Sequence, residues 1–581
     1  MSGDLSDPVG AITELLMARD YEPALAIATG MPSDHPESDA MRRVVFARMG
    51  RFAEAAEAGW RHLARPTASL EDRFRLAQIL TRCGDYRNAF TVGMGAIERA
   101  PEDWRLLIPV IEAVLAEPAL EAELRDAAAP IVALHPRCRP PSAAPAGALR
   151  VPTLLPHYDH LEGRHSIFTS FVRSIRGVEL YWPDSYGSGL VAAALEELPR
   201  AQAAVVGFLD ADPEIDRASA ARYVAARFPT LLVDDAGCAA DMLQHAPVTL
   251  AELPFFFSYD APHCLFQPFC PTEDMVLPAD APGIYRIIRH QLESPKCLGI
   301  VTLYEDAGRR LGVIFDSDII RDKCVFANPP SSPDLTIQHG RGSPVAVRGQ
   351  GETVTLFVPT SADARTEIFY LRGGVDILNA FAELSAGLPF LRLILRGPLP
   401  PGLSTQLRQL VQTHPAIRWL PDYLSSAEYE QILRHADVML LPSVATFRNG
   451  LVQAMGWGMV PVTSDAYYNA EIVQDGVSGV VVPGRARLAY ETEVPAGFVA
   501  DWCEIYRARD EPSDPDFFAA FKASLRALVT DRAMIARISS YNLRTPSRHL
   551  ASEESIARLS ALFEKGLRLP DVARARPVRH I

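Results

Sequence analysis

The chain has 581 residues, of which 48% are hydrophobic and 22% charged, and its formal net charge at pH 7 is −14. This length exceeds what one hydrophobic core can organise, and the composition is that of a folded protein rather than a disordered one. The acidic balance argues against nucleic acid as the main partner, and no apolar run is long enough to predict a membrane-spanning helix. A solvated acidic surface is the simplest interpretation of the charge.

The cysteines and the two ends of the chain predict the compartment. The eight cysteines include no Cys-x-x-Cys pair, which indicates reduced thiols and no metal site. The first ten residues, MSGDLSDPVG, are acidic and polar and do not resemble a signal peptide. We expect a cytoplasmic protein. Peripheral contact at the inner face of the membrane is an alternative because the tail, ARARPVRHI, is basic, although a solvated end also explains that tail.

Residues 1–135 are rich in alanine and contain an internal repeat. Segments beginning at Gly50 and Gly84 are 34 residues apart, and each has an aromatic residue two positions later and an alanine five positions later. A related segment begins at Asp20. This pattern resembles tetratricopeptide repeats, which are pairs of antiparallel helices. The resemblance implies a concave surface for a protein partner, and a rigid spacer or dimerisation element is an equal alternative.

Residues 136–149 are rich in proline and alanine and are expected to be a linker, and residues 150–345 form the next predicted domain. Apolar runs there alternate with helical patterns, as in an α/β domain. Asp210 and Asp212 are interpreted as part of a loop at the end of a strand. We expect strands at 151–155, 203–209, 230–233 and 298–302, a short strand within 323–330, helices at 166–175 and 307–311, and buried aromatic core at 255–257.

Residues 346–545 repeat this alternation, and residues 546–581 are expected to be a C-terminal helix and basic tail. We expect strands at 353–358, 391–395, 417–420, 438–441, 459–463 and 479–482. We expect a long loop at 359–372 and helices at 375–381, 425–435, 450–455, 470–473, 517–528, 534–543 and 551–567. Short strand–loop–helix connections are typical of a parallel sheet, in which ligands bind beyond the carboxyl ends of the strands. The fold class is therefore predicted to be α/β, with two Rossmann-like lobes preceded by an all-α domain.

The stretch from Ala436 to Gly484 carries the most specific pattern. It contains, in order, Pro442-Ser443, Ala454-Met455, Gly458, Pro461-Val462, Glu471-Ile472-Val473, Asp475-Gly476, Gly479 and Pro483. The pattern resembles glycosyltransferases of the GT-B fold and the GT4, or glycosyl transferases group 1, type. Two departures concern the chemistry of the site. The two glutamates of the family motif fall on Ala445 and Gln453, and a glycine pair falls on Tyr467-Tyr468.

This resemblance implies roles for particular residues. Arg372, with Arg365 as the nearest equivalent of a second arginine, would stabilise charge on a leaving diphosphate, and His157 is a further catalytic candidate. His160, Arg164 and His165 are expected on the acceptor side, with a solvated turn as the alternative. Donor binding is expected from Gly373, Arg396, Tyr423, Ser443, Arg448, Asn449, Gly450, Leu451, Gln453, Asn469 and Glu471.

The expected activity is transfer of a hexosyl group from a UDP- or GDP-sugar, with retention and without a metal or other cofactor. The acceptor would be a surface polysaccharide, a lipid-linked glycan or a protein held by the repeats. The alternative is a catalytically degenerate GT-B and repeat scaffold that binds a partner protein or a nucleotide without transfer. The replaced glutamates favour this alternative, whereas Arg372-Gly373, Glu471 and the glycine turns favour the enzyme.

Overall fold

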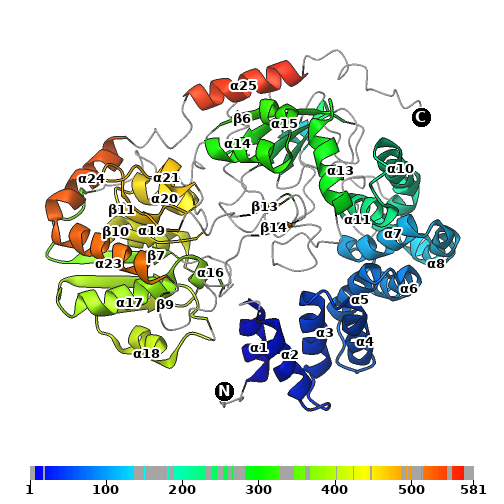
Figure 1. Cartoon of the computed structure of the whole chain (residues 1–581), viewed down its shortest axis with the longest axis horizontal. Helices are drawn as coiled ribbons and strands as arrows, with labels where there is room; N and C mark the ends of the chain where they lie inside the picture. Colours follow the sequence, from blue (N-terminus) through cyan, green and yellow to red (C-terminus); the bar gives the residue numbers. More distant parts are fainter. Residues whose placement is uncertain are drawn as a thin grey trace.

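The structure, a computed structural model, contains two α/β lobes and an arc of N-terminal helices (Figure 1). It describes residues 7–17, 20–136, 149–150, 180–181, 189–228, 238–244, 253–259, 265, 282–327, 346–359, 367–400, 402–422, 424–444, 448–466, 468–485, 492–494, 497–499, 512, 514–545 and 553–567. Within these residues, we find no helix whose length and hydropathy would suit a membrane span. The predicted α/β fold with an all-α N-terminal region is confirmed.

The N-terminal region consists of helices joined by short turns. Its α-helices are α1 (Pro8–Met17), α2 (Tyr21–Gly30), α3 (Ser38–Arg48), α4 (Phe52–Leu63), α5 (Leu70–Arg82), α6 (Tyr86–Ile97), α7 (Leu107–Ala116) and α8 (Glu121–Leu134). Two 3₁₀ turns, Trp104–Leu106 and Pro118–Leu120, flank α7. The helical prediction for this region is therefore confirmed.

The sequence repeat corresponds to a repeated turn. Asp20, Arg51 and Asp85 precede α2, α4 and α6 with φ/ψ of −86/67°, −85/64° and −86/65°. Gly50 and Gly84, just before two of these turns, have φ of +71° and +72°. Glycine adopts this left-handed conformation without the steric cost that a Cβ would bring. The turn repeats in space as in sequence, and the tetratricopeptide identity stays a prediction.

The packing between consecutive helices also repeats every 34 residues. A Cβ on Gly59 of α4 would lie 2.8 Å from Leu76 Cδ1 of α5, and a Cβ on Gly93 of α6 would lie 2.5 Å from Val110 Cγ2 of α7. Each glycine therefore allows the following helix to approach closely. Both residues of the second contact are 34 positions after those of the first.

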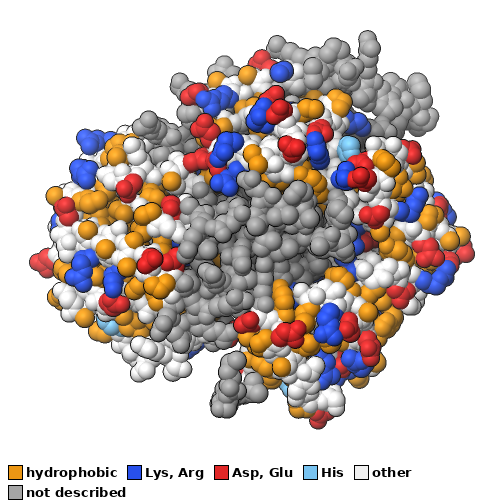
Figure 2. Space-filling view, viewed as in Figure 1, with side chains coloured by type: hydrophobic (Ala, Val, Ile, Leu, Met, Phe, Trp, Pro, Cys, Tyr) orange, Lys and Arg blue, Asp and Glu red, His pale blue; other side chains and the backbone are white. Residues whose placement is uncertain are grey.

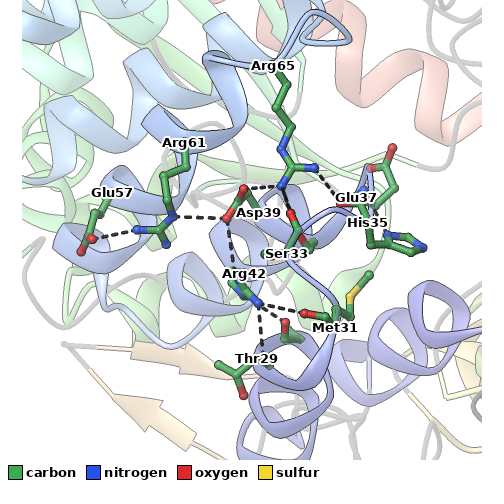
Figure 3. A network of polar contacts seen from close by, with 12 residues as sticks. Thr29, Met31, Ser33, His35, Glu37, Asp39, Arg42, Glu57, Arg61 and Arg65 are labelled. Atoms are coloured by element: carbon green, nitrogen blue, oxygen red, sulfur yellow. Dashed lines mark hydrogen bonds and ion pairs between the residues drawn. The ribbon is translucent and has the colours of Figure 1, made fainter.

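A buried carboxylate ties the start of α3 to the end of α4 (Figure 3). Asp39 is 5% exposed and accepts hydrogen bonds from Arg65 Nη2 at 2.6 Å and Arg61 Nε at 3.2 Å. Arg65 also donates to the backbone carbonyl of His35 at 2.6 Å. Burial raises the pKa of Asp39, but the hydrogen bonds and charges of the two arginines outweigh burial, so the pKa is lowered.

Asp72, in the first turn of α5, is expected to contribute to stability in a pH-dependent way. Burial raises its pKa, but hydrogen bonds with Ser69 and the charge of Arg43 lower it from 3.8 to about 2. Since the folded pKa is below the unfolded one, this stabilisation is complete above pH 3.8 and is lost as the pH falls toward 2. We expect Asp72→Asn to reduce the free energy of unfolding at pH 7 by about 1–2 kcal/mol after allowance for solvent screening.

Urea unfolding of the full chain at pH 7, 4 and 3, followed by circular dichroism, measures this difference. The difference in free energy of unfolding between wild type and Asp72→Asn should be smallest at the lowest pH. A gap that stays constant down to pH 3 would contradict the assignment. Glu71→Gln is the control: Glu71 pairs with the exposed Arg75 and Arg105, so its loss should cost under about 0.5 kcal/mol at every pH.

The N-terminal lobe has a six-stranded parallel sheet in the order β2-β1-β3-β4-β5-β6. The strands are β1 (Leu149–Arg150), β2 (Leu180–Tyr181), β3 (Ala240–Gln244), β4 (Phe255–Tyr259), β5 (Cys297–Thr302) and β6 (Cys324–Phe326). The helices are α10 (Leu190–Ala211), α11 (Arg217–Arg227), α13 (Pro282–Glu293), α14 (Glu305–Ile314) and α15 (Asp318–Lys323). The predicted strands at 298–302 and within 323–330 and the helix at 307–311 are confirmed.

One predicted strand is wrong. Residues 203–209 lie within α10, a helix of 22 residues. Ala201 and Val205 are buried on one face, whereas Val206 is 47% exposed, so burial follows the helical period rather than alternation. A short apolar run fits either pattern, and its continuity with the preceding helix decides the outcome. The buried aromatic run at 255–257 belongs to β4, and the predictions for 151–155, 166–175 and 230–233 lie outside the described residues.

The helical region packs directly on this lobe. α7 contacts α11, and the buried side chains of Glu112 and Arg222 form an ion pair between them, with Arg222 Nε 3.4 Å from Glu112 Oε1. At its other end the arc reaches the C-terminal lobe, because a Cβ on Gly402 would lie 2.0 Å from Glu14 Oε1 of α1. The arc of helices therefore touches both lobes.

The C-terminal lobe has a second six-stranded parallel sheet, in the order β12-β11-β10-β7-β8-β9. Its strands are β7 (Val354–Pro359), β8 (Leu391–Arg396), β9 (Ile417–Leu420), β10 (Val438–Leu441), β11 (Val460–Ser464) and β12 (Val480–Val482). Its helices are α16 (Glu367–Leu371), α17 (Gly374–Ser385), α18 (Thr405–Thr413), α19 (Ser426–His435), α20 (Arg448–Gly456), α21 (Asn469–Ile472), α23 (Pro515–Thr530) and α24 (Arg532–Arg544). A small antiparallel pair joins β13 (Thr492–Val494) and β14 (Gly497–Val499).

The six strands predicted for this lobe are confirmed to within one or two residues at their ends. Most are short apolar runs, as expected for strands of a parallel sheet covered on both faces, whereas β8 and the edge strand β9 also carry the exposed side chains of Arg392 and Arg418. The predicted long loop at 359–372 is wrong in part, because residues 367–371 form α16. The predicted helix at 425–435 is confirmed as α19, which begins with a capping box: the Ser425 side chain accepts from the Glu428 N–H, and the Glu428 side chain accepts from the Ser425 N–H.

The C-terminal helix α25 (Glu553–Leu567) returns to the N-terminal lobe (Figure 1). It packs on β5 and β6, with Leu559 and Phe563 buried and the rings of Phe563 and Phe256 in edge-to-face contact at 4.5 Å. Gly299 of β5 allows this close approach, because a Cβ there would lie 2.5 Å from Leu562 Cδ1. The last helix of the chain thus covers one face of the first sheet.

We expect Gly299→Val to destabilise this contact by about 1–3 kcal/mol, because the added methyl groups would overlap Leu562. Hydrogen–deuterium exchange of α25 should show the loss as faster exchange of its amides. Leu562→Ala in the same chain should recover part of the loss by making room. If Leu562→Ala gives no recovery, the cost arises elsewhere and the packing argument fails.

Candidate functional site at the lobe boundary

The second sheet reverses its strand order between β7 and β10. In open parallel sheets, ligands bind beyond the carboxyl ends of the strands at such a reversal. The connection after β7 carries Arg372 and Gly373, and the connection after β10 carries Ser443 and Arg448. Four residues predicted from separate motifs are thus on the two connections that flank the reversal.

Gly373 allows these two connections to touch. Its φ is +75°, and a Cβ there would lie 2.6 Å from the carbonyl oxygen of Pro442. The N–H of Val444 also donates to the carbonyl of Leu371 at 2.9 Å. A side chain at position 373 would push the connections apart, so glycine there has a packing reason. The N-terminus of α17 begins at this contact, and helix N-termini favour anions.

Two arginines lie near one half-buried tyrosine at the ends of β7 and β8. Arg372 donates through Nη1 to the carbonyl of Pro359. Arg396 is 9% exposed, and its Cζ lies 4.8 Å from the ring centre of Tyr429 on α19. Burial raises the pKa of Tyr429, and the positive charges of Arg396 and Arg372 oppose this rise. This side of the crevice is therefore positively charged, as a diphosphate site requires.

A buried ion pair supports the start of α17. Asp376, 3% exposed, pairs with Arg485, 0% exposed, and Arg485 Cζ lies 4.1 Å from the ring centre of Phe517. Burial raises the pKa of Asp376, opposed by the charge of Arg485, and burial lowers the pKa of Arg485, opposed by Asp376. The Arg485 N–H also donates to Asp465 Oδ1 at 2.7 Å. The pair therefore links the connections after β7, β11 and β12.

Ser443 and Asn469, both predicted to bind the donor, are buried next to each other. They are 1% and 0% exposed, and Asn469 Nδ2 donates to the hydroxyls of Ser443 and Ser464, both at 3.5 Å. The Ser464 hydroxyl donates to the carbonyl of Ser443. These bonds hold the connections after β10 and β11 together. Direct ligand contact by either side chain stays a prediction.

The predicted helix after β10 begins two residues earlier than expected, at Arg448. Asn449, Gly450 and Leu451 therefore lie in its first turn, where backbone N–H groups have no partner within the helix. Leu451 is 1% exposed, so its side chain packs in the core and only its backbone can reach a ligand. Gln453, on the next turn, is half-buried.

A pocket lies where the two lobes meet, with about 270 Å³ of empty volume that is partly open to solvent. Arg448 lines it and is 7% exposed; burial lowers the pKa of Arg448, and the nearby Tyr304 opposes this shift. Residues of α20 and α21 therefore face the N-terminal lobe at this pocket. The lining is Leu303, Tyr304 and Phe326 from the N-terminal lobe and Arg448, Val452, Glu471 and Ile472 from the C-terminal lobe.

The structure places Glu471 against the N-terminal lobe. Its Oε2 accepts from the Glu305 N–H at 2.9 Å, and its Oε1 accepts from the Asp306 N–H at 3.2 Å. These N–H groups begin α14, so the carboxylate caps a helix of the other lobe. Burial raises the pKa of Glu471, and these two backbone hydrogen bonds oppose the rise. A role in donor binding stays a prediction.

Several predicted site residues lie outside the described residues: His157, His160, Arg164, His165, Arg365 and Tyr423, together with Ala445. The backbone of Asn449 is described, but its side chain is not. Asp212 ends α10 rather than a strand, and it pairs with Arg286 and His290 at 3.2 and 3.3 Å. In the part of the chain that the structure describes, no group of three or more His, Cys, Asp or Glu residues could hold a metal ion.

Sequence reasoning did not single out Tyr304, Tyr429, Asp376 or Arg485. Tyr304 follows β5 by two residues, and Arg485 follows the Pro483-Gly484 turn, so each lies just beyond the end of a strand. Their position could have identified Tyr304 and Arg485 as candidates, because ligand sites in parallel sheets lie beyond the carboxyl ends of the strands. Tyr429 lies in the middle of α19, where an aromatic residue is expected to pack in the core. Asp376 lies in the first turn of a helix, where an acidic residue is common without any role in a site.

Comparison with known families gives one match, and it covers the positively charged side of the site. Residues 370–494 match the family Glycosyl transferases group 1. The group 1 segment includes Arg372, Gly373, Arg448 and Glu471, and it ends just beyond the Arg485 ion pair. No curated protein sequence matches the chain.

Solved structures with similar folds are distant from this chain. The Anabaena protein HepE in complex with UDP and glucose is 12% identical over 67% of this chain and 86% of its own, with a TM-score of 0.35. The pneumococcal O-GlcNAc transferase GtfA in complex with UDP and GlcNAc is 15% identical over 57% of both chains, with a TM-score of 0.37. The C-terminal domain of LpcC from Francisella tularensis, a glycosyl transferase group 1 family protein, is 14% identical over 33% of this chain and 83% of its own, with a TM-score of 0.24.

Proposed function

We propose that the protein transfers a hexosyl group from a UDP- or GDP-sugar to an acceptor hydroxyl, with retention of configuration. The observation that carries the proposal is the position of Arg372 and Gly373 at the strand-order reversal, inside the segment that matches the group 1 family. Arg396 adds a second positive charge close by, and the first turn of α20 adds backbone N–H groups that the helix itself does not use. These groups suit two phosphates rather than a neutral ligand.

In this transfer, the bond between the anomeric carbon and the β-phosphate oxygen breaks. A bond from the anomeric carbon to the acceptor oxygen forms on the same face of the sugar, and the acceptor proton passes to the departing phosphate. Negative charge grows on that phosphate as the first bond breaks. Arg372 would stabilise this charge more strongly in the transition state than in the bound donor, which is the condition for catalysis. No metal or other cofactor takes part in the proposed reaction.

The proposed acceptor is a surface polysaccharide, a lipid-linked glycan or a protein. The helices α1–α8 provide the surface on which a protein acceptor or partner would bind, consistent with the predicted tetratricopeptide-like repeats. Because this arc is packed on the N-terminal lobe through α7 and α11, a bound protein would be held at a set position relative to the site. The proposed location is the cytoplasm, with peripheral contact at the inner face of the membrane as an alternative.

Donor hydrolysis tests the proposal without knowledge of the acceptor. The full chain is incubated with a panel of UDP- and GDP-sugars, and release of UDP or GDP is measured beside an Arg372→Ala chain. Release from at least one donor that the variant lacks is the expected result. If no donor is hydrolysed and calorimetry detects no nucleotide binding, the proposal fails.

A degenerate scaffold is the second candidate, and one observation favours it. Ala445 and Gln453 occupy the positions of the two family glutamates, and alanine cannot form the hydrogen bond of a carboxylate to a sugar hydroxyl. This candidate predicts that UDP or GDP binds but that no donor of the panel turns over. Restoring both glutamates, by Ala445→Glu with Gln453→Glu, would then produce activity where the natural chain has none.

A further inference from the structure

Two contacts join one short segment of the C-terminal lobe to one short segment of the N-terminal lobe. The rings of Tyr468 and Tyr304 stack with centroids 4.5 Å apart and an interplanar angle of 22°. They are 2% and 6% exposed, so the stack is shielded from water. Three residues after Tyr468, the Glu471 carboxylate caps α14 through the N–H groups of Glu305 and Asp306. Residues 468–471 therefore bind residues 304–306 through both an aromatic and a polar contact.

These contacts border the pocket at the lobe boundary. Tyr304 and Glu471 both line it, and so does Arg448. In Figure 1, α20 and α21 face α14 between the two lobes. The lobes cannot separate along this boundary without unstacking the tyrosines and exposing the first N–H groups of α14. In this closed arrangement the cavity volume is only about 20 Å³, which is room for about one water molecule and far too little for a nucleotide.

Negative charges near Glu471 weaken the cap that its carboxylate forms on α14. The negative charges of Asp306 and Glu305 lie close to Glu471 and oppose its ionised form. Asp306 is itself paired with Arg309 and Arg310. The cap therefore combines favourable backbone hydrogen bonds with unfavourable neighbouring charges. Such a balance suits a contact that must break and re-form, unlike the fully buried Asp376–Arg485 pair.

We propose that Tyr304, Tyr468 and Glu471 form an interlobe latch, which holds the lobes closed and must open before a nucleotide-sized ligand can reach Arg448. Tyr468 is one of the two tyrosines at the position where the resemblance places a glycine pair, and glycine there could make no stack. The latch itself depends only on the contacts above. Its effect on nucleotide entry rests on the proposed function.

Hydrogen–deuterium exchange in the ligand-free full chain tests the latch directly. In Glu471→Ala, the amides at the start of α14 should exchange about tenfold faster, since they lose their acceptors, and Tyr468→Ala should speed the same amides through lobe separation. In the double variant, the fold-increase in exchange rate should be smaller than the product of the two single-variant increases, because either substitution alone already opens the latch. Unchanged exchange at residues 305–308 in Glu471→Ala overturns the proposal.

Two matched controls separate the latch from loss of folding. Glu428 caps α19 of its own lobe with the same chemistry, so Glu428→Ala should speed exchange at the start of α19 and leave α14 unchanged. Tyr285 stacks on Phe315 at the far end of α14, with centroids 4.9 Å apart, and its hydroxyl donates to the Ile314 carbonyl. Tyr285→Ala should therefore speed exchange near the end of α14 and leave its first turn unchanged. If either control speeds exchange at residues 305–308 as much as the latch variants do, the proposal is overturned.

Stopped-flow binding of UDP tests the consequence for entry. If the closed state limits access, Tyr468→Ala and Glu471→Ala should each raise the association rate at least about fivefold, in proportion to the open fraction. Equal association rates in wild type and both variants overturn the role in entry. If neither UDP nor GDP, tested in the same way, binds any of the three proteins, the proposed function fails, whereas the exchange experiment still decides whether the latch exists.

Discussion

Replacing Arg372 by alanine is expected to lower the rate of donor cleavage at least about 100-fold. Arg372 lies at the strand-order reversal beside Gly373, and its positive charge acts on the same neighbourhood as that of Arg396. In the proposed reaction, removing it takes away a guanidinium that would stabilise the departing phosphate. Because the loss falls on the transition state, kcat should fall much more than the KM for the donor rises. Steady-state release of UDP or GDP from the best donor measures both.

Arg372→Lys and Arg392→Ala complete this experiment. Lysine keeps the charge but not the planar fork of donors, so Arg372→Lys should recover only part of the rate. Arg392 lies on the exposed side of β8 and donates to the carbonyls of Pro389 and Leu391, so Arg392→Ala should stay within about twofold of wild type. A rate within tenfold of wild type in Arg372→Ala would show that the phosphate site is elsewhere.

Breaking the buried pair of Asp376 and Arg485 is expected to give the largest loss of stability. In Asp376→Ala, the guanidinium of Arg485 stays 0% exposed without its carboxylate. Removing one partner of a buried pair costs about 3–5 kcal/mol, because the remaining charge is left uncompensated. Urea unfolding of the full chain, followed by circular dichroism and by tryptophan fluorescence, measures the loss.

The double variant Asp376→Leu with Arg485→Met separates the pair from its packing. It removes both charges and keeps apolar volume beside Phe517, so it should lose less stability than Asp376→Ala alone. Glu430→Ala is the control: it removes a helix-surface pair with Arg434, at 2.6 Å, and should cost under about 0.5 kcal/mol. If Asp376→Ala costs no more than this surface control, the buried pair does not hold the connections together.

Local patterns in the sequence were enough for the architecture of the C-terminal lobe. Val438–Leu441, Val460–Ser464 and Val480–Val482 are apolar runs ended by proline, glycine or polar residues, and each became a parallel strand. The start of a helix can also be predicted from sequence where a side chain caps the backbone, as Ser425 does for α19. In the N-terminal region, the 34-residue spacing of Gly50 and Gly84 predicted turns whose dihedral angles are nearly identical.

The prediction of the candidate site can be compared with the structure on its C-terminal side, since the predicted acceptor-side residues lie outside the described residues. Arg372, Gly373 and Arg448 lie close in sequence to strand ends, and the rule for parallel sheets places such residues at a common edge. The same rule cannot choose between strand and helix for an apolar run such as 203–209, because the residues on its two sides decide that outcome. Nor could the sequence show that Leu451, predicted as a donor residue, has its side chain in the core.

The sequence by itself determined the parallel sheets, the repeated helical turns and the glycines and arginines that meet at the strand-order reversal, because each depends on neighbours a few residues away. Only the tertiary structure decided which side chains meet across the lobes. Glu471 caps Glu305 from 166 positions away, and Asp376 pairs with Arg485 from 109 positions away. Such contacts depend on how two separately built sheets pack together, and no local pattern in one chain carries that information.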